Sequence, residues 1–287
     1  MLLSDATVSS TPFTARGRRI PVDGSPLLMG VLNVTPDSFS DGARYLDPAA
    51  AVAHALAMVG QGADLIDIGA ESSRPGASPV DEPEELRRLI PVVTALCRET
   101  TVPVSVDTTK AAVARRALEA GACIVNDISA LRFDAGMAQV VAEAGAGLVL
   151  MHMQGWPRTM QQAPHYVDVV EEIRAFFVER MQTAMEAGIA REQILLDPGL
   201  GFGKTLEHNL TLLRRLDAFL TLGRPIVVGA SRKAFIGTVL NRAVDERLMG
   251  TAAAIAVAIL RGARVVRVHD VEAMRDVVKM VQAIRHA

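Results

Sequence analysis

Short apolar runs recur along the chain from residue 27 onward, and most of them end in polar or glycine residues. Val, Ile and Leu follow one another within these runs with little polar alternation, which is typical of parallel strands buried on both faces. The pattern therefore predicts strands at eight places: Leu27–Leu32, Leu65–Ile68, Val102–Val106, Ile124–Ile128, Leu148–Met151, Ile194–Leu196, Ile226–Val228 and Val265–Val268.

The segments between these runs have the composition of helices. They are rich in Ala, Leu, Glu and Arg and end near glycine or a charged residue, as helices do. The clearest are five: Ala49–Val59, Pro83–Arg98, Ala111–Ala120, Val167–Ala187 and Arg247–Arg261. Regular strand–helix units without a break in composition predict an α/β fold, a single-domain (β/α)8 TIM barrel, rather than an open doubly wound sheet.

The segments outside the regular units are also informative. Residues 11–26 contain turn signals and predict a hairpin or lid ahead of the first barrel strand, and we expect the first ten residues to be disordered. We therefore divide the chain into an N-terminal extension, 1–25, and the barrel, 26–287. Three long connections are expected to be either functional lids or disordered segments: Asn33–Asp47, Ala70–Asp81 and Met153–Val167.

Composition narrows the class of protein. The chain has 287 residues, half of them hydrophobic, which can fill one barrel, and its net charge of −2 gives no support for nucleic-acid binding. Cys97 and Cys123 match neither a disulfide framework nor a thiolate metal site, so we expect a cytoplasmic protein. The first ten residues do not resemble a signal peptide, and the apolar run Ala252–Leu260 is too short to span a membrane.

Polar residues follow nearly every predicted strand. In a TIM barrel the carboxyl ends of the strands and the loops after them build the active site. We therefore expect one polar site at this end of the barrel, drawn from these residues: Asn33, Asp67 and Glu71, Asp107, Asn126 and Asp127, His152, Asp197, Ser231–Lys233, and Arg267 with His269.

These residues divide into two kinds of chemistry. Acceptors and an amide, from Asp107, Asn126 and Asp197, can read the guanidine-like edge of a flat nitrogen heterocycle. Cationic or donor groups suit phosphate oxygens and a departing anion. This second set comprises Arg74, Lys233, Arg267 and His269. The sequence thus predicts a phosphorylated heterocyclic ligand.

Other motifs are absent or misleading. The segment Pro198–Thr205 ends like a phosphate-binding P-loop, but proline stands where the first glycine is needed. We expect its glycines to let the backbone approach a ligand, with Phe202 covering it. No His, Cys or carboxylate residues have the spacing of a zinc site. A Mg²⁺ held mainly by substrate phosphates, with Asn33 as one protein ligand, would leave little signal in the sequence. No nucleophile elbow supports covalent catalysis.

Long motifs extend over essentially the whole predicted barrel: Met29–Gly42, Gly69–Gly76, Ser105–Lys110, Asn126–Ile128, Met151–Gly155, Asp197–Lys204, Ser231–Lys233 and Arg267–Asp270. In order and spacing they closely resemble the dihydropteroate synthase family, pterin-binding TIM-barrel transferases of folate biosynthesis and targets of sulfonamides. The resemblance implies condensation of 6-hydroxymethyl-7,8-dihydropterin pyrophosphate with 4-aminobenzoate, which gives 7,8-dihydropteroate and pyrophosphate and requires Mg²⁺.

The resemblance also assigns roles to residues. It implies that Asp107, Asn126, Asp197 and Lys233 hold the pterin, and that Asn33, Arg267 and His269 bind the pyrophosphate, with Asn33 also binding the magnesium. Ser73, Pro75, Phe202 and Ser231 would line the aminobenzoate pocket, and Asp37, Phe39 and Arg74 would belong to loops that close over the site. The implied catalytic set is Asn33, Asp107, Lys233, Arg267 and His269.

The implied mechanism is a dissociative substitution, in which the methylene–oxygen bond breaks before the aryl amine attacks. Ser73 departs from the threonine common in the family's second loop, and we expect turnover with a slightly looser aminobenzoate pocket; equal constants for wild type and Ser73→Thr would contradict this. Trp156 has no role that we can derive. The family also implies a homodimer, although the small residues of Thr251–Ala258 favour helix-to-barrel packing.

Two other functions stay open from the sequence. A pterin-binding methyltransferase barrel would share the pterin pocket but would not need the pyrophosphate-binding residues. A catalytically silent paralogue would bind pterin or a partner without turnover. The motifs containing Asn33, Arg267 and His269 favour the synthase over both, and a pyrophosphate-release assay separates the synthase from the methyltransferase.

Overall fold

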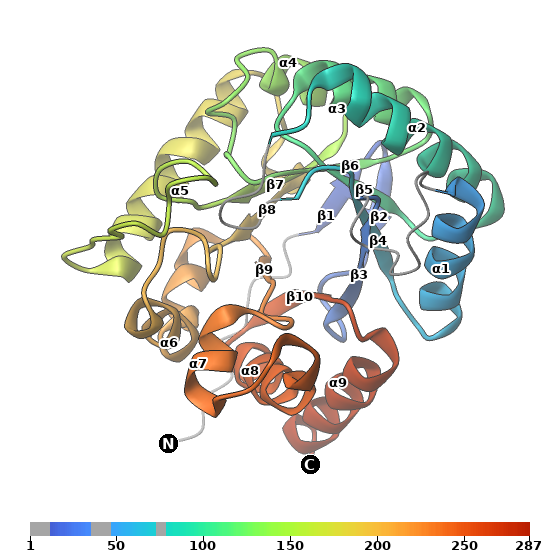
Figure 1. Ribbon diagram of the computed structural model, residues 1–287. Coiled ribbons are helices and arrows are strands. Elements are labelled where there is room, and N and C mark those ends of the chain that lie inside the picture. The colour runs from blue at the N-terminus through green and yellow to red at the C-terminus, as the bar shows by residue number, and fades with distance from the viewer. Residues whose placement is uncertain (1–11, 36–46, 73–78) are drawn as a thin grey trace.

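The computed structural model describes residues 12–35, 47–72 and 79–287. Eight parallel strands form a closed barrel in which each pairs with its neighbour in chain order and β10 pairs with β3 (Figure 1). The predicted barrel is confirmed, and the open sheet is excluded. The strands are β3 (Leu27–Asn33), β4 (Leu65–Gly69), β5 (Val104–Asp107), β6 (Ile124–Asp127), β7 (Gly147–Met151), β8 (Ile194–Asp197), β9 (Ile226–Val228) and β10 (Ala263–Val268).

Helices surround the barrel as an outer ring (Figure 1). The five helices predicted from composition are present, with their ends shifted by at most two residues. The shorter α4, α6 and α7 and the C-terminal α9 were not predicted as helices. The bounds are α1 (Pro48–Gly60), α2 (Glu82–Glu99), α3 (Ala111–Glu119), α4 (Met137–Ala144), α5 (Val169–Glu186), α6 (Leu206–Arg214), α7 (Ala234–Leu240), α8 (Leu248–Leu260) and α9 (Val271–Arg285), with short 3-10 turns at Arg191–Gln193, Leu216–Leu222 and Val244–Glu246.

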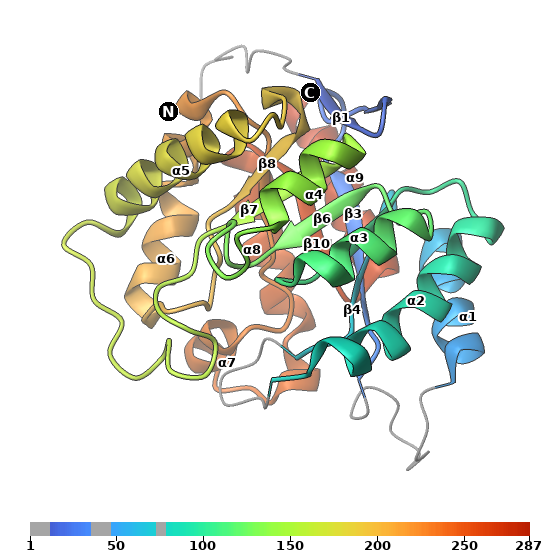
Figure 2. The same ribbon diagram turned by 90° about the horizontal axis from the view of Figure 1, so that it is seen from above.

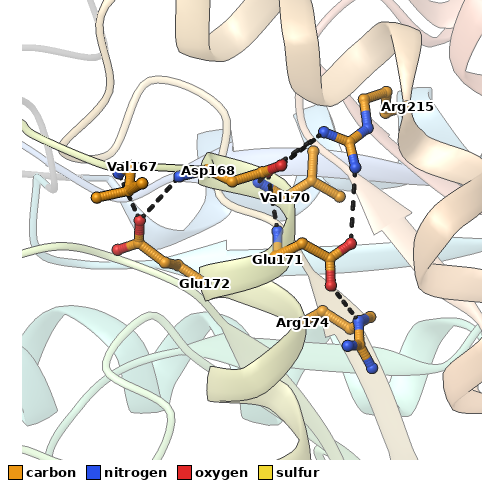
Figure 3. Close-up of polar contacts among 7 residues, drawn as sticks. All are labelled: Val167, Asp168, Val170, Glu171, Glu172, Arg174 and Arg215. Atoms are coloured by element: carbon orange, nitrogen blue, oxygen red, sulfur yellow. Dashed lines mark hydrogen bonds and ion pairs between the residues drawn. The ribbon is translucent and has the colours of Figure 1, made fainter.

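Two element boundaries differ from the sequence prediction for identifiable reasons. The strand expected from Val102 begins at Val104, because Pro103 has no N–H to give to a ladder. The helix expected from Val167 begins at Val169, because the Asp168 carboxylate caps it by accepting from the Val170 N–H at 2.9 Å. Figure 3 shows this cap and Arg215, which pairs with it from the end of α6.

Side chains along each barrel strand alternate between the surrounding helices and the barrel interior. On β4, Ile66 and Ile68 pack in the large core between strands and helices, whereas Leu65 packs with apolar residues inside the amino end of the barrel. Asp67 lies two residues after Leu65 and therefore faces the interior as well. This alternation decides which polar residues can meet inside the carboxyl end.

The N-terminal extension forms a hairpin of β1 (Phe13–Ala15) and β2 (Arg18–Ile20) that closes the amino end of the barrel. Figure 2 shows it at the end of the barrel opposite α7. The Phe13 ring occupies the space where a Cβ on Gly147 would lie, 2.7 Å from Cζ. The hairpin prediction is confirmed, whereas the division at residue 25 stays a prediction. Behind the hairpin lie apolar residues: Leu27, Met29, Leu65, Ile124, Val149, Leu195, Val227 and Val265.

Within the described part of the chain, we find no helix with both the length and the apolar character needed to cross a membrane. Cys97 and Cys123 are both free thiols. Burial raises the pKa of Cys97 to about 11, aided by the neighbouring Cys123, so this thiol stays protonated at neutral pH.

Candidate active site

One register row crosses four strands at the carboxyl end of the barrel. Asn33 pairs with Gly69, Gly69 with Asp107, and Asp107 with Asn126. Gly69 contributes no side chain to this row, and a Cβ there would lie 3.4 Å from the Asp107 Cβ. The fold thus brings Asn33, Asp107 and Asn126 together, and Gly69 leaves space between Asn33 and Asp107.

Arg267 connects this row to a deeper carboxylate. Its Nε donates to Asp67 Oδ2 at 2.6 Å, and its Nη2 donates to Asp107 Oδ2 at 2.9 Å. The Asn126 Nδ2 donates to the same Asp67 oxygen at 3.0 Å. Burial acts to lower the pKa of Arg267, but the two carboxylates outweigh it and raise that pKa, so the guanidinium stays charged.

Asp107 and Asp197 are acids with perturbed pKa values. Burial raises the pKa of Asp107 to about 7; Arg267 opposes the shift and the Asp67 carboxylate adds to it. Burial also raises the pKa of Asp197, against the effect of Lys233 and a 2.7 Å hydrogen bond from the Gly199 N–H. A ligand that donates N–H groups would stabilise both ionised forms, which fits the predicted heterocycle.

Lys233 lies in the same corner as Asp197. Its Nζ donates to the Leu200 carbonyl and lies 4.6 Å from the centroid of the Phe202 ring, a cation–π contact. Burial lowers the pKa of Lys233 to about 8, and Asp197 limits the shift. The corner therefore combines an ammonium, a carboxylate and an aromatic face.

The ends of β9 and β10 are joined by side-chain contacts. Ser231 Oγ accepts from the His269 N–H at 3.2 Å and lies 3.0 Å from His269 Nδ1. Next to it, Arg232 forms a two-pronged ion pair with Asp270 at the start of α9. The predicted aminobenzoate residue Ser231 is thus held against the predicted pyrophosphate residue His269.

The glycine-rich loop after β8 packs against the loop after β7. A Cβ on Gly199 would lie 2.0 Å from the His152 carbonyl oxygen, and one on Gly203 would lie 2.7 Å from the Gln154 oxygen; both glycines have positive φ. The close approaches that require these glycines are therefore to protein backbone, whereas we expected an approach to a ligand. Phe202 packs beside four buried residues: Ile128, Met151, Met153 and Met160.

Three polar residues of this region had no derived role in the sequence prediction. Lys204, at the end of the P-loop-like segment, is buried and donates to the Phe202 carbonyl at 2.9 Å, with His152 Nδ1 at 3.0 Å. The sequence prediction places Asp67 only among the strand-end residues. The feature that could have singled it out is a charged residue between two isoleucines of an apolar strand. Asp127 follows Asn126 and points away from the interior, where it accepts from the Ser129 and Leu131 N–H groups at 2.8 Å each.

Several predicted residues lie outside the described part of the chain. They belong to two predicted loops: Asp37 and Phe39 in the first, and Ser73, Arg74 and Pro75 in the second. Among the described residues there is no group of three or more His, Cys, Asp or Glu side chains that could hold a metal.

Comparisons with known proteins agree with the motif resemblance. A family model described as "Pterin binding enzyme" matches residues 29–269. The dihydropteroate synthase of Escherichia coli K12 is 48% identical over 258 residues, which is 90% of this chain and 91% of that protein.

Two solved structures of Xanthomonas albilineans dihydropteroate synthase have the same fold. The one with 4-aminobenzoic acid has a TM-score of 0.91 and 46% identity, and covers 97% of this chain and 100% of that chain. The one with 7,8-dihydropteroate has a TM-score of 0.87 and 43% identity, and covers 96% and 99% respectively. Since the family model and the relative both span most of the sequence, the chain belongs to the dihydropteroate synthase family of pterin-binding enzymes.

Proposed function

We propose that this chain condenses 6-hydroxymethyl-7,8-dihydropterin pyrophosphate with 4-aminobenzoate, forming 7,8-dihydropteroate and releasing pyrophosphate. The observation that supports this most is the layer of polar side chains inside the carboxyl end of the barrel. There the acids Asp107 and Asp197 and the amide of Asn126 lie beside Arg267 and Lys233. The ligands in the two structures of the Xanthomonas enzyme, 4-aminobenzoate and dihydropteroate, are a substrate and the product of this reaction.

The pterin ring is held by Asp107, Asn126, Asp197 and Lys233 in this proposal. Burial raises the pKa of both acids and so disfavours their ionised forms. Hydrogen bonds from N–H donors of the ring would stabilise these ionised forms. Charge that develops on the ring when the methylene–oxygen bond breaks is stabilised by the same carboxylates.

The leaving group is bound by Arg267 and His269 with Asn33. As the methylene–oxygen bond breaks, its electron pair goes to the pyrophosphate, and Arg267 is a fixed positive charge held by Asp67 and Asp107. A preorganised charge of this kind needs little reorganisation during the reaction. The aryl amine then forms a bond to the methylene carbon and releases a proton.

The 4-aminobenzoate is placed against Phe202 and Ser231, together with Ser73 and Pro75. The Phe202 ring packs beside Met151, Met153 and Met160 and contacts Lys233. An apolar surface therefore lies next to the residues proposed to hold the pterin. The closing roles of Asp37, Phe39 and Arg74 stay predictions from the sequence.

A magnesium ion fits this site only if the substrate supplies most of its ligands. Asn33 offers one amide oxygen at the end of β3, in the register row that also contains Asp107, and the described residues include no metal cage. A Mg²⁺ with one protein ligand and several phosphate and water oxygens is common. When bound, it would neutralise charge on the departing pyrophosphate.

A homodimer is proposed from the outer ring. α8 and α9 lie side by side (Figure 1), and both present exposed apolar side chains, including Met249 at 78% and Met280 at 62% exposure. A second copy of this chain would cover such residues. We propose a cytoplasmic location, which suits two free thiols.

The test is to incubate the protein with dihydropterin pyrophosphate, 4-aminobenzoate and Mg²⁺ and to measure dihydropteroate by chromatography. Lys233→Ala should lower kcat/KM by about 10²- to 10³-fold, as expected for loss of one charged group at the reacting centre. Lys279→Ala, an exposed lysine on α9, is the matched control and should leave it unchanged.

The rival functions predict other results. If the wild type binds the pterin substrate without forming product, the silent-paralogue function takes the place of this proposal. If it forms no pyrophosphate but passes a methyl group from a methylated pterin to a corrinoid protein, the methyltransferase function does.

A further inference from the structure

Asp67 is a charged residue beneath the site. Its side chain has no exposed surface, and it pairs in register with Ser105, one layer deeper than the row of Asp107 and Asn126. The proposed reaction assigns no contact with substrate to this carboxylate. A buried charge is costly unless it is paired and hydrogen-bonded, so its two partners indicate what it does.

Both partners use the same oxygen of Asp67. Oδ2 accepts from Arg267 Nε at 2.6 Å and from Asn126 Nδ2 at 3.0 Å. Both partners also belong to the proposed substrate-binding set, one for the pyrophosphate and one for the pterin. Asp67 therefore links the two halves of the site from below.

This contact decides which way the Asn126 amide faces. A free amide can present either its oxygen or its NH₂ group to a ligand, whereas an ionised carboxylate is only an acceptor. Asp67 Oδ2 is the acceptor for both Arg267 Nε and Asn126 Nδ2 in this structure. Because the NH₂ group of Asn126 is held by Asp67, its Oδ1 is the atom left to bond elsewhere.

We propose that Asp67 is a positioning residue that fixes Asn126 as a hydrogen-bond acceptor toward the pterin and holds Arg267 in place. This inference rests on the proposed function and adds a specificity rule to it. The ring must present an N–H or NH₂ donor to Asn126, and the donor–acceptor order at this position is set by Asp67.

The sharpest test exchanges the two side chains. In Asp67→Asn, the new amide can present either its oxygen or its NH₂ group to Asn126, so it no longer requires the NH₂ group of Asn126, and Asn126 can turn. In the double variant Asp67→Asn/Asn126→Asp, the new amide uses both of its polar atoms where the wild type uses one oxygen: its NH₂ group turns toward the new carboxylate, and its oxygen accepts from Arg267 Nε. The second carboxylate oxygen again offers an acceptor to the ring, and the net charge is unchanged.

Binding of 6-hydroxymethylpterin, which has no phosphate, is measured by calorimetry without magnesium, so that only ring recognition is tested. We expect Asp67→Asn to weaken binding by about 10- to 100-fold, the range for a hydrogen bond to a charged group. The double variant should recover most of this loss, a coupling that independent sites do not show. The KM for 4-aminobenzoate should stay near its wild-type value in both variants.

Ser105→Ala is the control for packing in this layer, because Ser105 is buried beside Asp67 and its Oγ has no hydrogen-bond partner among the described residues. It should bind the ring like wild type. Wild-type ring binding by Asp67→Asn, or no recovery in a folded double variant, would overturn the inference. If Asp67→Asn does not fold, the double variant still decides: restored binding supports the inference and lost binding refutes it.

The outcome can be told apart from failure of the proposed function. If the wild type makes no dihydropteroate but the exchange restores ring binding, the proposed reaction is wrong and the positioning role stands. If the wild type makes product and the exchange does not restore ring binding, the reaction stands and the positioning role is wrong.

Discussion

The two ends of the barrel interior are built from the same strands, and their inward side chains are two residues apart along each strand. At the amino end the inward side chains are apolar, as with Leu195 on β8, and pack under the hairpin. On four of the strands, the inward side chain two residues further on, about 7 Å along the strand, is polar. The pairs are Leu65 and Asp67, Ile124 and Asn126, Leu195 and Asp197, and Val265 and Arg267.

This difference separates what stabilises the fold from what binds the ligand. Apolar burial at the amino end is favourable by about 25 cal/mol per Å². At the carboxyl end, burial raises the pKa of Asp107 and Asp197 and lowers that of Lys233, so these charged forms are disfavoured until a ligand bonds to them. Substitutions at the two ends should therefore have opposite effects.

The largest expected effect is at the amino end. Phe13→Ala removes a fully buried ring from the hairpin and should lower the free energy of unfolding by about 3–5 kcal/mol. The kcat/KM for dihydropteroate formation at 25 °C should not change. Denaturant unfolding and steady-state kinetics measure the two quantities.

Arg19→Ala is the control on the same hairpin, because Arg19 is exposed and pairs only with Asp23 among the described residues. It should change the free energy of unfolding by less than about 1 kcal/mol. A loss of kcat/KM in folded Phe13→Ala would show that the two ends are not separate.

The next effect is at the carboxyl end and depends on pH. In the unfolded chain Asp107 has a pKa of about 3.9, and in the folded protein about 7. Between these values the folded state holds the proton and the unfolded state does not, so the wild type loses stability as pH rises through this window. The loss is at most about 1.4 kcal/mol per pH unit and stops above about pH 7.

Asp107→Asn cannot lose this proton, so it should become more stable relative to wild type between pH 5 and pH 7, while its kcat/KM falls. Thermal unfolding at several pH values measures the difference. Asp276→Asn, on the exposed side of α9, controls for losing a carboxylate as such. A stability difference that is constant across this range would refute the account of Asp107.

The smallest effect is expected outside the barrel interior. Trp156 is 61% exposed and stacks on Phe133, with ring centroids 4.1 Å apart. Trp156→Ala should lower the free energy of unfolding by about 0.5–1.5 kcal/mol, the value of an aromatic pair, and leave kcat/KM unchanged. A large loss of activity would extend the functional region beyond the interior layer.

Most of the fold could be predicted from the sequence because buried parallel strands leave continuous apolar runs. The composition does not predict the short helices α4, α6 and α7 or the C-terminal α9, and it does not show that Pro103 moves the start of β5 to Val104. The hairpin was predicted from its turn residues, but its place under the barrel depends on contacts between Phe13 and Gly147, far apart in sequence.

The candidate site was predicted as a set of strand-end residues, and the structure adds the direction of each side chain. Asn126 and Asp127 are neighbours in sequence, yet only the first faces the interior, because the pleat alternates. The pairing of Asp67 with Arg267 joins residues two hundred positions apart. Such pairings follow from barrel closure, which no local pattern reveals.

The most direct test compares two substitutions one pleat apart on β8, with kcat/KM and the free energy of unfolding measured for each. Leu195→Ala should lose about 2–5 kcal/mol of stability and keep its kcat/KM while folded. Asp197→Asn should keep or gain stability and lose pterin binding and kcat/KM. If both variants lose stability and activity in the same proportion, the separation of the two layers is wrong.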